Sequence, residues 1–190
     1  DVRDGKALAV TKKILYQLRY GDETPRGFLD GKFYKNDYSA GEKALILPEK
    51  HVYCGYDMGE EKRVLEDRCF LLSLHELDML FPTAAARKSV CTPAAEKSLP
   101  KEAGIYYKDR FTTRDDFGSW AEITEKGRVR FFGGHHQEQF AGLRPAIWIK
   151  TVSKAGEDSL PESVYKEMAA AETSMSLYNR GGHGVYVETE

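Results

Sequence analysis

The clearest alternation of apolar and polar positions lies at residues 141–150. Leucine, proline and isoleucine occupy one side of an extended strand there, whereas Arg144 and Trp148 fall on the other side. A strand with an aliphatic face and a tryptophan on its second face has protein to contact on both sides. The pattern therefore predicts one strand over residues 141–150, near the middle of the core.

Helix starts are marked by three Ser-x-x-Glu capping boxes, which begin at Ser39, Ser73 and Ser159. In such a box, the serine hydroxyl and the glutamate carboxylate each accept a backbone N–H of the other residue. Thr24 followed by proline is a further helix start, with threonine as the N-cap and proline in the first turn. The box at Ser73 directly follows an apolar stretch at residues 68–72, so we expect a strand that runs into a capped helix.

Irregular segments are predicted where no period is sustained. Residues 11–20 are predicted to be helical or irregular, residues 51–62 to be a loop, and residues 83–104 to be a long surface excursion with one short helical turn. Loops of the last size are uncommon inside compact domains and often carry function.

An extended pattern dominates residues 105–133. Short strands are predicted at residues 6–10, 105–108, 111–114, 119–124 and 128–132. Gly127 lies in the hairpin loop between the last two strands, at a position suited to positive φ. Capped helices beside a small antiparallel meander define an α+β fold.

Composition narrows the class of protein. The 190 residues are 41 % hydrophobic and 31 % charged, as in a globular domain, and the net charge of −2 with scattered Lys and Arg argues against nucleic-acid binding. No apolar run is long enough to form a membrane-spanning segment. Asp1 is not a natural start, which leaves open an upstream segment that was removed.

The three cysteines, Cys54, Cys69 and Cys91, form no C-x-x-C motif. We expect them to be reduced and partly buried, although one disulfide stays an alternative.

The composition changes after residue 150, and this change suggests two parts. We predict a domain at residues 1–150 and a C-terminal helical appendage at residues 151–190. The appendage would form a helix at residues 162–178 that packs on the domain or on a partner.

Several blocks of the sequence resemble an uncharacterised bacterial domain family. These blocks are Arg26-Gly-Phe-Leu-Asp-Gly-Lys-Phe33, Phe70-Leu-Leu-Ser-Leu-His-Glu76 and Gly142-Leu-Arg-Pro-Ala-Ile-Trp-Ile149. The family is similar in motif order to the C-type-lectin-like fold of formylglycine-generating-enzyme relatives and of the variable receptor proteins of retroelements. The resemblance implies two helices beside a small, twisted, mostly antiparallel sheet with long loops. It also implies a surface or secreted protein of gut or other anaerobic bacteria.

The sequence departs from these relatives in ways that limit the functional inference. The family's Trp-Trp-Leu-Arg-Ser block is Phe111-Thr-Thr-Arg114 here, and the Glu-Pro-Asn or Gln-Pro-Asp signature of calcium-dependent lectins is absent. Calcium-dependent sugar binding is therefore not expected. The paired catalytic cysteines of formylglycine-generating enzymes have no matching motif, so the resemblance implies no active site.

Candidate binding residues gather near the predicted loops. We assign the recognition surface to residues 83–104, 115–119 and 133–139, with the ligand-binding residues Arg114, Trp120, His135, His136 and Glu138. Imidazole and carboxylate groups bind metals, but a site needs further ligands that the sequence does not identify. No metal, cofactor or catalytic residue is therefore assigned.

The sequence thus favours a non-catalytic module that binds an unknown protein or carbohydrate ligand. Two alternatives stay open: a metal-assisted enzyme centred on the loop at residues 133–139, and a structural or assembly role. The resemblance favours a secreted or cell-surface location.

Overall fold

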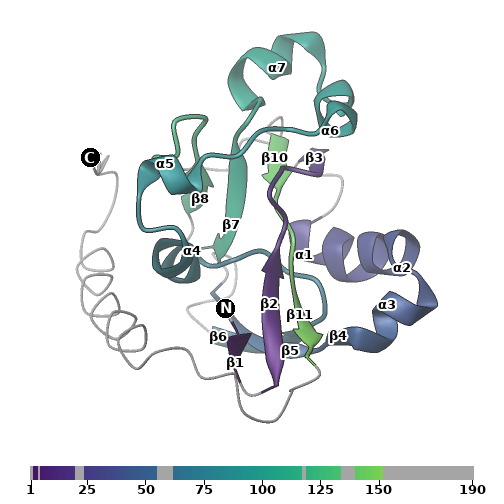
Figure 1. Ribbon diagram of the computed structural model, residues 1–190. Coiled ribbons are helices and arrows are strands. Elements are labelled where there is room, and N and C mark those ends of the chain that lie inside the picture. The colour runs from purple at the N-terminus through teal and green to yellow at the C-terminus, as the bar shows by residue number, and fades with distance from the viewer. Residues whose placement is uncertain are drawn as a thin grey trace.

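Small antiparallel sheets and short helices make up the part of the chain that the structure describes (Figure 1). The structure is a computed structural model, and it describes residues 2–3, 5–19, 24–54, 62–116, 119–133 and 140–151. The described strands form one four-stranded sheet, one three-stranded sheet and two two-stranded sheets, and every strand pair in them is antiparallel. The predicted α+β class is therefore confirmed.

The four-stranded sheet has the order β1 (Val2–Arg3), β2 (Lys6–Val10), β11 (Ala146–Lys150) and β4 (Ile46–Leu47). The two-stranded sheets pair β3 (Tyr16–Arg19) with β10 (Phe140–Leu143), and β5 (Glu49–Cys54) with β6 (Lys62–Asp67). The three-stranded sheet contains β7 (Phe111–Asp116), β8 (Ser119–Ile123) and β9 (Val129–Gly133), which confirms the predicted meander.

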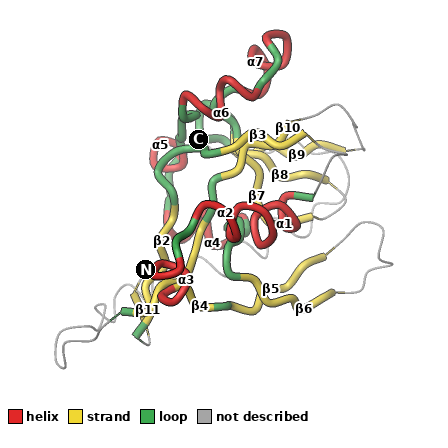
Figure 2. The backbone as a smooth tube through the Cα atoms, turned by 90° about the vertical axis from the view of Figure 1, so that its right-hand side faces the viewer, coloured by secondary structure: helices red, strands yellow, loops and turns green. Residues whose placement is uncertain are grey.

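The helical elements fall into two groups along the chain (Figure 2). The first group is α1 (Pro25–Gly27), the π-helix η1 (Phe28–Phe33), α2 (Tyr34–Asp37) and α3 (Ala40–Leu45). The second is α4 (Leu74–Leu80), α5 (Ala84–Arg87), α6 (Pro93–Ser98) and α7 (Lys101–Tyr107). Ser39 and Ser73 both form complete capping boxes and Thr24 caps α1, so these three predicted helix starts are confirmed.

The prediction of a single strand at residues 141–150 is wrong, because Arg144 and Pro145 divide it into β10 and β11. Proline has no N–H to donate to a ladder. The Pro145 carbonyl instead accepts the N–H of Thr11, and the Arg144 Nε donates to the Thr11 carbonyl at 2.7 Å. Strand β10 therefore continues against β3, and β11 continues against β2, as two halves of a kinked ribbon.

Tertiary contacts also overturn several local predictions. Residues 11–20 contain β3, and the described residues of the range 51–62 belong to β5 and β6. The strand predicted at residues 105–108 belongs mostly to α7. The excursion predicted at residues 83–104 contains α5, α6 and the start of α7, and its buried residues are Arg87, Ser89, Cys91, Ala95 and Leu99. Residues 69–72 are buried, but they form no strand, and their bridge to the sheet is the single pair Phe70–Ala146.

Two hydrophobic clusters fill the core. One joins the β2–β11 ribbon to α4, α6 and the meander, and it includes Ile14, Phe70, Leu77, Ile123 and Trp148. The other joins η1 to the β3–β10 pair, and it includes Leu29, Phe33, Leu71, Ala141 and Leu143. The segment at residues 69–72 contributes side chains to both clusters, so it links them although it is not part of a sheet.

Candidate functional site

The predicted binding residues fall into three groups in the structure. Arg114 is described fully and lies in the interior. Trp120 lies in β8, but its side chain is outside the described part of the chain. His135, His136 and Glu138 lie outside the described residues, as does the predicted appendage beyond Thr151. The roles of these residues in ligand binding stay predictions.

An open cleft of about 380 Å³ lies beside the first helical group. It is lined by Arg26, Gly27, Asp30, Gly31, Tyr34, Lys35 and Arg68. The first six come from consecutive turns of α1, η1 and α2, and Arg68 follows directly after β6. The cleft therefore lies where one helical segment meets the end of the β5–β6 hairpin.

The helical segment has an unusual backbone at this point. Six residues of η1 have π-helical geometry, which is rare and is often found at functional sites. The same element buries Leu29 and Phe33 in the core, so its inner face is fixed while its outer face lines the cleft. Gly31 adds no side chain to the wall, and a β-carbon built there would meet no atom within 4 Å.

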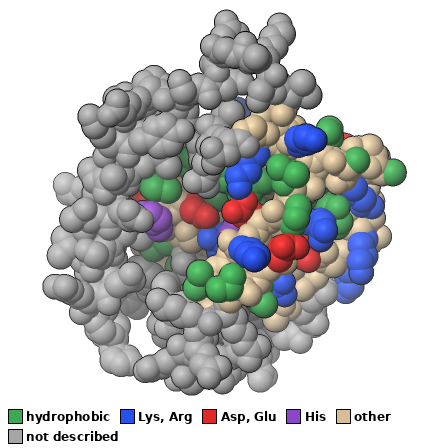
Figure 3. All heavy atoms as spheres, turned by 90° about the horizontal axis from the view of Figure 1, so that it is seen from below, with side chains coloured by type: hydrophobic (Ala, Val, Ile, Leu, Met, Phe, Trp, Pro, Cys, Tyr) green, Lys and Arg blue, Asp and Glu red, His purple; other side chains and the backbone are tan. Residues whose placement is uncertain are grey.

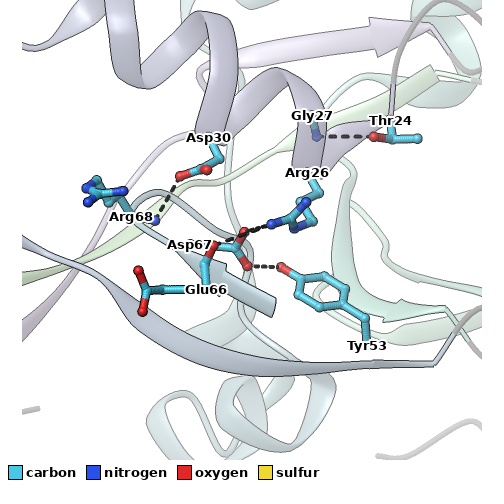
Figure 4. A network of polar contacts seen from close by, with 8 residues as sticks. All are labelled: Thr24, Arg26, Gly27, Asp30, Tyr53, Glu66, Asp67 and Arg68. Carbon is cyan, nitrogen blue, oxygen red and sulfur yellow. Dashed lines mark hydrogen bonds and ion pairs between the residues drawn. The ribbon is translucent and has the colours of Figure 1, made fainter. Parts of the chain in front are cut away.

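Asp67 holds Arg26 at the edge of the cleft (Figure 4). The Asp67 side chain has no exposed surface; its Oδ1 lies 2.7 Å from Arg26 Nη2, and its Oδ2 accepts a 2.7 Å hydrogen bond from the Tyr53 hydroxyl. Arg26 Nη2 also donates to the Glu66 carbonyl. Burial is the main cause that raises the pKa of Tyr53, and the hydrogen bond from its hydroxyl to Asp67 raises it further. The guanidinium is therefore oriented before any ligand arrives, and its Nε is buried without a hydrogen-bond partner.

Asp30 is fixed in a similar way. Its Oδ1 accepts the backbone N–H of Arg68 at 2.9 Å, which ties η1 to the end of β6. In Figure 4, Arg26 and Arg68 lie on opposite sides of Asp30. The cleft thus presents a carboxylate between two guanidinium groups, all carried by segments that are bonded to one another.

The surroundings of the cleft are basic although the chain as a whole is slightly acidic. Arg26, Lys35 and Arg68 line it, and Lys43 and Arg68 both lie within 6 Å of the Tyr34 ring centre. Figure 3 shows that Lys and Arg side chains gather on the right-hand part of its face, the side on which α2 and α3 lie in Figure 1. Asp67 offsets the charge of Arg26 and Asp30 offsets one more, so one of the three positive charges of Arg26, Lys35 and Arg68 remains in excess.

Arg114 joins several segments behind the β5–β6 hairpin. Its Nη2 lies 3.0 Å from Glu76 Oε1, its Nη1 donates to the Leu71 carbonyl, and its backbone N–H donates to the Leu72 carbonyl. The Arg114 side chain is only 8 % exposed. These contacts attach β7 to the segment that precedes α4, which is a structural task.

His51 lies in the same region and is almost completely buried. Its ring packs on Phe70 with ring centres 4.1 Å apart, and its Nε2 is buried without a hydrogen-bond partner. Burial, and secondly the nearby Arg114 charge, lower the pKa of His51 to about 4, despite the opposing carboxylates of Glu76, Asp67 and Glu49. The imidazole is therefore neutral in the folded protein at pH 7.

Replacing His51 by glutamine is expected to change how stability depends on pH. Since the unfolded pKa of His51 is higher than the folded one, the unfolded chain binds the extra proton. The contribution of His51 to stability therefore falls as pH is lowered from about 6.5 to 4. The loss attributable to His51 is at most about 3 kcal/mol. Urea unfolding across this range would measure the difference between wild type and His51→Gln. An equal pH slope in both proteins would contradict the assignment.

The comparison with the variant is needed because Glu122 opposes the effect. Burial raises the pKa of Glu122 to about 7, although Arg110, 3.3 Å away, and Arg130 lower it. A raised carboxyl pKa favours the folded state at low pH, and this contribution is lost as pH rises through the folded pKa. The wild-type profile alone therefore combines two opposite slopes.

The arrangement of possible metal ligands and thiols does not suggest chemistry in the described residues. No group of three or more His, Cys, Asp or Glu side chains there is placed to hold a metal ion. Cys69 and Cys91 are free and buried, as predicted, and burial raises the pKa of the Cys69 thiol to about 12. Within these same ranges, no helix combines the length and the apolar character that spanning a membrane requires.

Sequence reasoning did not identify the cleft residues as a site. The block from Arg26 to Phe33 carries part of the family resemblance, and the helix start at Thr24 that precedes it is confirmed. Its polar residues at 26 and 30 are four apart, which places them on one helical face. That spacing was the available signal, but Arg68 comes from a distant part of the chain.

Comparison with known proteins identifies the family. The chain belongs to a family described as a domain of unknown function (DUF6273), whose model matches residues 5–151. The matched region begins and ends at Gly5 and Thr151, which are joined by a backbone hydrogen bond beside the β2–β11 pair. No curated protein and no solved structure matches the chain.

Proposed function

We propose that the protein is a non-catalytic ligand-binding module with a C-type-lectin-like fold. Its binding site in the described part of the chain is the cleft between the first helical group and Arg68. The observation that carries the proposal is the fixed position of Arg26, which a fully buried Asp67 holds at the edge of an open cleft. A buried carboxylate that orients a partly exposed arginine prepares it for recognition, because less side-chain entropy is lost on binding.

The chemistry of the lining supports binding more than catalysis. A nucleophile requires a base within hydrogen-bond reach, and a general acid–base pair requires two groups with separated pKa values. The described lining consists of arginine, lysine, aspartate, tyrosine and glycine. Its one carboxylate, Asp30, already accepts the Arg68 N–H, and its cations serve as hydrogen-bond donors.

The C-type-lectin-like assignment is supported by the order of the sequence blocks and by a frame of short helices beside small antiparallel sheets. The same resemblance supports an origin in a bacterial surface or secreted protein.

Nuclear magnetic resonance titration of ¹⁵N-labelled protein tests the site. We expect a panel of neutral sugars, acidic sugars and short peptides to contain a ligand that shifts the backbone signals of residues 26–35 and of Arg68. Arg26→Gln is expected to lower the affinity for that ligand about tenfold, since a hydrogen bond to a charged group is lost. Arg19→Gln, an exposed change of equal charge on β3, is the matched control. Binding that leaves these signals unmoved, or that is insensitive to Arg26→Gln, would contradict the site.

A further inference from the structure

We infer that the cleft recognises a hexuronic acid, a sugar ring that bears a carboxylate, either free or as the terminal unit of a glycan. The inference rests on the proposed function and names the ligand class of the same cleft.

The charge of the cleft favours an anionic group on the ligand. Arg26, Lys35 and Arg68 line it, and the Asp67 carboxylate that pairs with Arg26 is fully buried on the protein side. The contacts that hold Arg26 use its Nη2. Its Nε is buried, but the side chain is 37 % exposed and Nη1 takes part in neither contact. Nη1 and the exposed Lys35 ammonium are therefore available to a carboxylate in a charge-assisted interaction.

Asp30 determines which polar groups the ligand carries beside its own carboxylate. An ionised aspartate accepts hydrogen bonds and repels a second anion, so it disfavours a ligand whose polar groups are all acidic. Its Oδ1 accepts the Arg68 N–H, and its Oδ2 has lone pairs that can receive a hydroxyl proton. A ligand with hydroxyl groups next to a carboxylate satisfies both the cations and Asp30, which is the pattern of a uronic acid and not of an acidic peptide.

The size of the cleft agrees with one ring. Its volume of about 380 Å³ lies at the small end of the range for small-molecule sites, roughly 300–1,000 Å³. The backbone of Gly27 and Gly31 forms part of the wall, which allows a ring to approach the helix closely. A single terminal sugar fits this space, whereas a peptide strand or a helix would need a longer groove.

Titrations of the labelled protein with matched probes test the inference. The probes are D-glucuronate, D-galacturonate, D-glucose, D-galactose and a triglutamate peptide. We expect a uronate to shift the signals of residues 26–35 at concentrations about tenfold lower than its neutral counterpart. Lys35→Gln, at an exposed position, is expected to lower the affinity for the uronate about three- to fivefold, because one surface ion pair is lost. The matched control Lys97→Gln, exposed on α6, is expected to change nothing.

The other outcomes distinguish this inference from the proposed function. If neutral sugars bind the cleft as tightly as uronates, the cleft is a binding site but the assignment of an acidic sugar is overturned. If triglutamate binds there more tightly than either uronate, the ligand is an acidic peptide and the assignment is again overturned. If no probe shifts the cleft signals while one shifts signals elsewhere, both the inference and the proposed site are overturned.

Discussion

Replacing Gly127 by alanine is expected to lower the free energy of unfolding by about 3–5 kcal/mol. Gly127 has φ of +79°, a conformation that costs a residue with a side chain about 1–2 kcal/mol. A β-carbon built there would lie 1.8 Å from the Ala84 carbonyl oxygen, which is backbone and cannot rotate away. The hairpin turn and α5 would have to separate, and the 3.0 Å hydrogen bond from Arg87 Nε to the Gly127 carbonyl would be strained or lost.

The consequence extends into the interior because Arg87 is only 4 % exposed and also binds Asp78. A displaced Arg87 would leave buried polar groups without partners. Chemical denaturation would measure the loss. Gly41→Ala is the control, since Gly41 lies in α3 with no atom near its missing β-carbon, and alanine there is expected to stabilise the helix by up to about 1 kcal/mol. Equal stability of the two variants would refute the close approach at Gly127.

Replacing Glu76 by alanine is expected to destabilise the protein by about 3 kcal/mol. Glu76 completes the capping box with Ser73 and also pairs with Arg114, whose side chain is 8 % exposed. The variant therefore loses a helix cap and leaves a nearly buried guanidinium without its carboxylate. Glu42→Ala is the matched control, because Glu42 forms the same box with Ser39 at the surface. We expect a clearly smaller loss for it in the same denaturation assay.

The dependence on pH provides a second readout for Glu76. Burial by itself raises the pKa of Glu76, but Arg114 and the Ser73 N–H outweigh burial, and the pKa is lowered overall. A lowered carboxyl pKa means that the stabilisation is complete above the unfolded pKa, about 4.3, and is lost as pH falls through the folded pKa. The difference between wild type and Glu76→Ala should therefore shrink as pH is lowered below about 4.3. A difference that stays constant would show that charge pairing with Arg114 contributes little.

These predictions distinguish two kinds of information in the sequence. Ser39 and Ser73 start helices because a capping box is closed by residues three apart, and Gly127 adopts positive φ because its turn is equally local. Such features were predicted correctly from the sequence. The three-stranded meander was also predicted, since its strands are consecutive and short connections favour antiparallel neighbours.

The errors occur where partners are distant in sequence. The sequence around residues 51–62 has no clear period, yet β5 pairs with β6, and the buried His51 and Asp67 of this pair contact Phe70 and Arg26. The sequence predicts a surface loop at residues 83–104, but Cys91 forms a β-bridge with Ile14 and the Arg87 Nε donates to the Gly127 carbonyl. A burial that depends on another segment leaves little trace in local periodicity.

The block at residues 141–150 shows both kinds of information together. The sequence by itself determined that this block is extended and buried on both sides, and it placed the chain in an uncharacterised family that the match to residues 5–151 confirms. Only the tertiary structure decided that Arg144 and Pro145 divide the block between two sheets, because β10 pairs with β3 and β11 pairs with β2. Thr11, which lies between β2 and β3, is bonded to the two residues at the break. The cleft also depends on tertiary structure. Its helical wall is formed by consecutive residues, whereas Arg68 and the buried Asp67 that orients Arg26 come from the end of the β5–β6 hairpin.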